Sequence, residues 1–118
     1  MKAAKRRELK IYETESGFRP FENYLINLKD IAGASKIQKA VTQMANGNFG
    51  DHKSISKGDG LYERRLTVGP GYRIYYILDG DELIVLFGAS DKSGQKKAID
   101  IAHGHAFDYG RRKKQRLD

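Results

Sequence analysis

The stretch that decides the fold covers residues 69–78 and reads GPGYRIYYIL. The glycines and proline at its start mark a turn, and the aromatic and β-branched residues that follow are typical of a strand. Arg73 stands inside this strand between apolar neighbours, where a buried and unpaired arginine would be costly. The side of the sheet that Arg73 occupies therefore determines what can be inferred about function.

Two more apolar-rich runs flank this strand, LYERRLTV at 61–68 and LIVLFGA at 83–89. The connections GPG and DGDE are strong turn signals, so the three runs are predicted to form an antiparallel meander. An alternation of apolar and polar residues over 8–14 predicts one further strand near the N-terminus.

Helical periodicity follows the first strand. Pro20 suits the first turn of a helix, which the apolar spacing places at about residues 19–29. A second apolar stripe begins near Asp30 or Ala34 and ends at Gly47, a natural C-terminal stop. We interpret both stripes as core-facing surfaces.

The remaining segments complete one domain over residues 1–118. Segment 47–60 is rich in Gly, Ser, Asp and Lys and is predicted to be a loop, while Ser93 is predicted to cap a last helix. The order β-α-α-β-β-β-α predicts a small α+β fold with a mainly antiparallel sheet, helices packed on one face and a C-terminal helix. Residues 1–7 are expected to form a basic arm and residues 110–118 a flexible basic tail.

Composition narrows the class of protein. The 118 residues include no cysteine, which excludes disulfide scaffolds, zinc–thiolate sites and cysteine nucleophiles. No apolar run is long enough to cross a bilayer, and the basic start MKAAKRRELK lacks the apolar region of a secretory signal, so we expect a cytoplasmic protein.

The formal net charge is +7, with +3 in residues 1–8 and +4 in residues 111–118, so the body between them is neutral. Such basic ends could bind phosphates or simply be solvated.

Side chains alternate along a strand, so each strand divides its residues between two faces. If the more apolar set faces the helices, the opposite face is expected to be uncovered and to carry a mixed set: Glu63, Arg65, Arg73 and Tyr75. Arg64 departs from this pattern and is expected near a strand edge. The last strand runs out into three polar residues: Ser90, Asp91 and Lys92.

This face has two interpretations that strand geometry leaves open. Glu63 could pair with either neighbouring arginine in an ordinary surface ion-pair ladder. Alternatively, the guanidinium groups match phosphate oxygens and could neutralise the charge of a phosphoryl-transfer transition state. Tyr75 could donate a hydrogen bond or stack on a base, or simply pack. Lys53 and Lys57 in the loop could contact an RNA backbone or stay solvated.

The same segments resemble a known family. The ordered set LYERRL, GPGYRIYY and LFGASDKS, with ASKIQKA, MANGNFGDHKS and the later DIA, is similar to the RelE/ParE superfamily of bacterial toxins. Within it, the chain resembles the addiction-module killer proteins of the HigB/RelE-like group, over about residues 10–109. The resemblance implies a compact toxin that is expressed with a cognate antitoxin, often a helix-turn-helix protein encoded beside it. DNA would be contacted only through that antitoxin, and no membrane partner is implied.

RelE-like members are typically ribosome-dependent endoribonucleases, or mRNA interferases, that cut mRNA and arrest translation without a metal ion or other cofactor. The resemblance assigns the phosphate-stabilising cations to Arg73, Arg65 and Lys92, and it places Glu63 where the family has another basic residue. Two alternatives remain open: a ParE-like inhibitor of DNA gyrase, and a non-catalytic relative that only binds its antitoxin.

The general base is left unassigned, because the C-terminal aromatic residue that RelE-like toxins often use would fall near Ala98 or is absent. Glu63 is the first candidate, since a carboxylate on the arginine-bearing face could accept a proton. Asp91, beside Lys92, is the second. A third possibility is a histidine, because the unperturbed pKa of imidazole suits proton transfer near neutral pH. The chain has three histidines, His52, His103 and His105.

Overall fold

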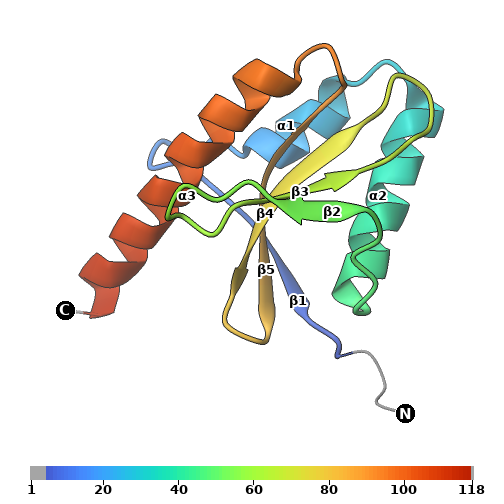
Figure 1. The fold of residues 1–118 in the computed structure, drawn as a ribbon. Helices are drawn as coiled ribbons and strands as arrows, with labels where there is room; N and C mark the ends of the chain where they lie inside the picture. The colour runs from blue at the N-terminus through green and yellow to red at the C-terminus, as the bar shows by residue number, and fades with distance from the viewer. Residues whose placement is uncertain (1–4, 118) are drawn as a thin grey trace.

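The computed structural model describes residues 5–117 and shows a five-stranded sheet between two helical layers (Figure 1). The elements are β1 (Glu8–Ile11), α1 (Pro20–Asn27), α2 (Ile31–Ala45), β2 (His52–Ser54), β3 (Tyr62–Arg65), β4 (Arg73–Asp79), β5 (Leu83–Ser90) and α3 (Gln95–Leu117). The strand order is β1-β5-β4-β3-β2, with β1 parallel to β5 and the other pairs antiparallel. The predicted α+β class and mainly antiparallel sheet are confirmed.

The first two helices begin and end where local chemistry predicts. Pro20 is the first residue of α1, and Asp30 caps α2 by accepting a hydrogen bond from the Gly33 N–H at 2.9 Å. Gly47 follows the end of α2 with a φ of 95°, a left-handed conformation that glycine adopts without strain.

Helices cover both faces of the sheet. Helices α1 and α2 pack over one apolar cluster of the sheet: Ile74, Tyr76, Ile84 and Leu86. Helix α3 packs over a second cluster on the opposite face: Tyr75, Val85 and Phe87. The expectation of one uncovered face is therefore wrong. Ala102 and Ala106 of α3 need an apolar surface, and the alternate side chains of β4 and β5 provide it.

A β-bulge lies near the end of β5. The register with β4 shifts between Tyr75 and Tyr76, which makes Phe87 an extra residue in β5. A bulge of this kind reverses the alternation of the side chains that follow it. As a result, Ala89 joins the face covered by α1 and α2, whereas Ser90 shares the face of Tyr75.

Two segments are more regular than predicted. Within the expected loop, β2 forms an edge strand against β3; its three residues HKS are all exposed, so no apolar alternation could reveal it. Helix α3 continues to Leu117 through the segment expected to be a flexible tail. Ion pairs stabilise this part of the helix. Arg111 and Arg112 pair with Asp108 of the same helix, and Lys113 pairs with Asp79 at the end of β4. Of the expected basic arm, residues 1–4 lie outside the described residues.

Within residues 5–117, no helix combines the length and the apolar character that crossing a membrane requires.

Candidate functional site

The candidate site lies at one end of the sheet, on the face that α3 covers. The strand register places Arg65 opposite Arg73, and Arg73 opposite Ser90. We call these three residues the arginine row. One step further along the strands, Glu63 lies opposite Tyr75. The residues that strand alternation grouped together are therefore neighbours across β3, β4 and β5.

Glu63 and Arg73 form a buried ion pair. The Glu63 side chain is 0% exposed and that of Arg73 12%, and Arg73 Nη1 lies 3.8 Å from Glu63 Oε1. This distance is too long for a hydrogen bond. In the described chain, Arg73 Nε, Arg73 Nη1 and Glu63 Oε1 are all buried without a hydrogen-bond partner. The idea that alternation frees Arg73 from burial is thus wrong, because α3 begins over this part of the sheet.

Gln95, the first residue of α3, contacts the same pair. Its Nε2 donates a hydrogen bond of 2.8 Å to Glu63 Oε2, which commits one carboxylate oxygen and leaves Oε1 facing Arg73. Sequence reasoning missed Gln95 because the contact joins the start of α3 to a distant strand. The one available signal was its place three residues after Lys92, where the connection from β5 enters α3.

Tyr75 contacts the arginine row through Ser90. Its hydroxyl lies 2.9 Å from Ser90 Oγ, and its ring is 1% exposed. Burial raises the pKa of Tyr75 to about 12, so the phenol is neutral at physiological pH. Tyr75 therefore orients Ser90 and does not offer an open stacking surface to RNA.

Accessible positive charge surrounds the buried pair. Arg65 pairs with Asp51 at 3.1 Å, yet its side chain remains 38% exposed. Lys53 lies opposite Glu63 on the edge strand β2, and the Lys92 N–H bonds to the carbonyl of Pro70 in the β3–β4 turn. Neither lysine has an ion-pair partner within residues 5–117, so this end of the sheet carries uncompensated positive charge.

Two other basic residues, Lys57 and Arg64, lie apart from the arginine row. Lys57 is in the loop before β3, at the far end of that strand from Arg65, and its N–H bonds to Asp59. Arg64 is buried on the opposite face of the sheet and donates to Gln43 Oε1 and the Asn48 carbonyl. Arg64 thus bridges α2 to the sheet. It was expected near a strand edge, and the structure places it within β3, paired with β2 on one side and with β4 on the other.

Asp91 has a local structural role. Its Oδ1 accepts hydrogen bonds of 2.8 Å from the Ser93 hydroxyl and the Gly94 N–H. These bonds, led by that of Ser93, hold the pKa of Asp91 below its ordinary value. Asp91, and not Ser93 as predicted, therefore stabilises the turn into α3, and its lowered pKa suits a general base poorly.

None of the three histidines belongs to the arginine row. His52 lies on the opposite face of the sheet, where its Nδ1 is 2.9 Å from the Tyr76 hydroxyl. His103 Nδ1 is 2.5 Å from Asp59 Oδ2, a contact that fixes α3 to the loop before β3. Burial lowers the pKa of His105, so its imidazole is neutral at pH 7.

The arrangement is suited to binding an oxyanion. Arginine N–H groups that make no hydrogen bond could donate to the oxygens of a phosphate, and the lysines add charge that reaches solvent. Among residues 5–117, no group of three or more His, Asp or Glu side chains is arranged to hold a metal ion.

The fold and the site together define a small α+β protein with a cationic site at one end of its sheet. No family model matches the chain. Over 82 residues the chain is 38% identical to an uncharacterized protein of Haemophilus influenzae, and the alignment covers 70% of this chain and 81% of that protein. The chain belongs to the same family as the Haemophilus protein.

Proposed function

We propose that this protein is the toxin of a toxin–antitoxin module and that it cleaves mRNA on the ribosome without a metal ion or cofactor. The observation that supports this best is the direct opposition of Arg65 and Arg73 in the β3–β4 ladder. Like charges in this position destabilise a sheet, and an anion held between them removes the repulsion. An RNA phosphodiester is such an anion, and its oxygens match guanidinium donors.

In this proposal, Arg73 is the main phosphate-stabilising residue. Its Nε and Nη1 are buried and make no hydrogen bond in the described chain, so two donors become available to phosphate oxygens once the first turn of α3 shifts. Arg65 and Lys92 add positive charge from the adjacent strand and from the connection after β5. Donors that are fixed before the reaction stabilise developing negative charge most effectively.

Glu63 is the proposed proton acceptor. The ribose 2′-oxygen attacks the adjacent phosphorus, its proton passes to Glu63 Oε1, and the bond to the 5′-oxygen breaks as that oxygen takes a proton from water, which leaves a 2′,3′-cyclic phosphate. Oε1 has no donor of its own. Because Glu63 is fully buried and bound by Gln95, the first turn of α3 must shift for RNA to reach the carboxylate.

The proposed partners follow from this activity. A cognate antitoxin, a helix-turn-helix protein encoded next to the toxin, would cover or distort the arginine row and would be the only contact with DNA. In the cytoplasm the toxin would act on ribosome-bound mRNA. The exposed basic end of α3, with Lys114 and Arg116, would add contacts to ribosomal phosphates.

Induction in cells that lack the antitoxin, followed by pulse labelling, tests the proposal. We expect protein synthesis to fall before DNA synthesis, with new 5′ ends inside coding regions, and we expect Arg73→Ala to abolish both effects. Arg19→Ala, which alters an exposed arginine of the α1 cap, should remain toxic. Early arrest of DNA synthesis with intact mRNA would contradict the proposal and favour gyrase inhibition. Absence of any growth defect would point to a non-catalytic antitoxin-binding protein.

A further inference from the structure

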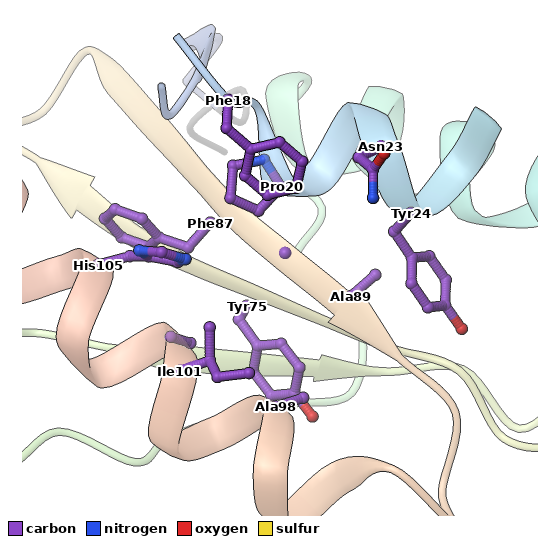
Figure 2. A pocket seen from close by; sticks show the side chains of 12 residues that line it. Phe18, Pro20, Asn23, Tyr24, Tyr75, Phe87, Ala89, Ala98, Ile101 and His105 are labelled. Atoms are coloured by element: carbon purple, nitrogen blue, oxygen red, sulfur yellow. The ribbon is translucent and has the colours of Figure 1, made fainter. Parts of the chain in front are cut away.

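A cavity opens between α1 and α3 close to the C-terminal end of β5 (Figure 2). Its volume is about 240 Å³. Small residues form its floor: Gly88 and Ala89 of β5 and Ala98 of α3. The space exists because these positions lack side chains that would fill it, and because the bulge at Phe87 changes the course of β5 there.

Aromatic and aliphatic side chains form the walls. Phe18 and Ile101 stand at the opening and are 48% and 49% exposed. Tyr24 is half-buried, and Figure 2 shows its ring extending from α1 toward the end of β5. Tyr75 and Phe87, which are almost fully buried, close the inner end.

The cavity is uncharged. Of the described side chains that line it, none is acidic or basic apart from His105, whose lowered pKa keeps it neutral. Burial raises the pKa of Tyr24, so its hydroxyl is neutral as well. Asn23 Oδ1 accepts a hydrogen bond of 3.0 Å from Asn27, and Figure 2 shows the Asn23 amide nitrogen directed toward the cavity. The cavity thus offers an apolar space with a few hydrogen-bonding groups at its edge.

The cavity adjoins the arginine row through Tyr75. The ring of Tyr75 lines the cavity, while its hydroxyl lies 2.9 Å from Ser90 Oγ. Ser90 follows Ala89 of the cavity floor and stands opposite Arg73 in the sheet. A ligand that spans both parts would meet guanidinium groups at one end and neutral aromatic surface at the other.

We infer that this cavity binds one nucleobase of the RNA, next to the phosphate held by the arginine row. A nucleotide has the required combination of an anionic phosphate and a flat, neutral ring. Unstacked bases are commonly held by stacking on aromatic side chains and by hydrogen bonds to their edges. The volume is below the roughly 300–1,000 Å³ of pockets for drug-sized ligands, so it suits a single ring system. The inference rests on the proposed function and adds a base-binding site to it.

Three kinds of probe separate the two parts of this site: inorganic phosphate, ribose 5-phosphate and the four nucleoside 5′-monophosphates. Each is titrated into the isotope-labelled full chain, and backbone amide shifts are followed by NMR. Shifts at Arg73 and Ser90 report on the row, and shifts at Gly88, Ala98 and Ile101 report on the cavity. We expect phosphate and ribose 5-phosphate to affect the row alone. At least one nucleotide should affect both parts and bind roughly 5- to 100-fold more tightly than ribose 5-phosphate, as expected for one stacked base.

Substitutions in the cavity wall test whether the base occupies the cavity. Ala98→Leu fills the cavity floor with a residue that favours helices, and it should remove the nucleotide's advantage while the phosphate response at the row persists. Tyr24→Leu keeps an apolar wall but removes the ring, and it provides a second test if Ala98→Leu does not fold. Ala32→Leu, in the exposed first turn of α2, is the matched control and should change neither response.

The outcomes distinguish this inference from the function on which it rests. Nucleotides that bind no better than ribose 5-phosphate, or that leave the cavity amides unshifted, overturn the base site while the phosphate site stands. A cavity that serves a side chain of the antitoxin would give this result. Cavity shifts with nucleotides, but no response of the row to any phosphate, would support base binding and contradict the proposed role of Arg73. No binding of any probe would overturn both.

Discussion

Arg65 and Arg73 stand directly opposite each other in the antiparallel β3–β4 ladder. Each has one carboxylate nearby, at 3.1 Å from Asp51 for Arg65 and at 3.8 Å from Glu63 for Arg73. The pairing nevertheless places two side chains of like charge opposite each other on the same face of the sheet. A sheet that keeps this pair sacrifices some stability, which is expected where the charges serve a ligand.

Removal of one of these charges should therefore stabilise the free protein. We expect Arg65→Gln to raise the free energy of unfolding by roughly 0.2–1 kcal/mol, the usual scale of a cross-strand pair. The same variant should bind phosphate more weakly. Urea unfolding with and without phosphate measures both effects, and a variant that is less stable and equally responsive to phosphate would contradict the prediction.

The hydrogen bond from Gln95 to Glu63 should stabilise the folded protein. Gln95→Ala leaves Glu63 Oε2 buried without its donor, at a cost of about 1–3 kcal/mol. Gln95→Glu should cost more at pH 7, because it places a second carboxylate beside Glu63, and part of that loss should be recovered in acid as a carboxylate is protonated. Gln38→Ala, an exposed glutamine of α2, is the control. Equal stability of the two Gln95 variants at pH 7 would contradict this role.

Asp108 should anchor the C-terminal half of α3 in a pH-dependent way. The hydrogen bond from Tyr12, at 2.5 Å, and those from Arg111 and Arg112 hold the pKa of Asp108 below its ordinary 3.8. Because this pKa is lowered in the folded protein, the stabilisation is complete above pH 3.8 and is lost as the pH falls through the folded-state value.

Thermal unfolding of Asp108→Asn at several pH values measures this effect. The variant should be less stable than the wild type at pH 7, and the difference should shrink below about pH 4. Asp100→Asn, an exposed position of α3, should show no such dependence. A difference that stays constant down to pH 2 would exclude ionised Asp108 as the cause.

The basic end of α3 should contribute to ribosome binding. Arg111, Arg112 and Lys113 are already engaged in ion pairs, so deletion of the whole segment would also disturb the fold. The double variant Lys114→Gln, Arg116→Gln is the cleaner test. It should lower the log–log salt dependence of ribosome association by roughly 1–2, whereas Lys36→Gln, Lys39→Gln on α2 should not. An unchanged slope would show that the helix end does not contact ribosomal phosphate.

Most of the fold could be predicted from local chemistry. The turns at GPG and DGDE, Pro20 at the start of α1 and the stop at Gly47 are short-range signals, and the structure confirms the elements that they delimit. The position of α3 could not be predicted, since its apolar stripe does not specify which face of the sheet it covers. Strand β2 was hidden because its pairing depends on backbone hydrogen bonds of an exposed edge.

The candidate site was predictable only in part. Strand alternation grouped Glu63, Arg65, Arg73 and Tyr75 correctly, because the two-residue period determines the shared face. Burial of these residues was not predictable, since it depends on how α3 lies on the sheet. Gln95 and the cavity depend on the same tertiary contact and on the bulge at Phe87, neither of which has a local sequence signal.

The most direct test of the central claim is cleavage of ribosome-bound mRNA by purified protein, compared between wild type and Arg73→Ala. Circular dichroism and antitoxin binding should first show that the variant is folded. We predict cleavage by the wild type and a loss of at least about 100-fold in the variant, the usual scale for removal of a transition-state donor. A folded Arg73→Ala protein that cleaves at the wild-type rate, or a wild type that never cleaves, would contradict the claim.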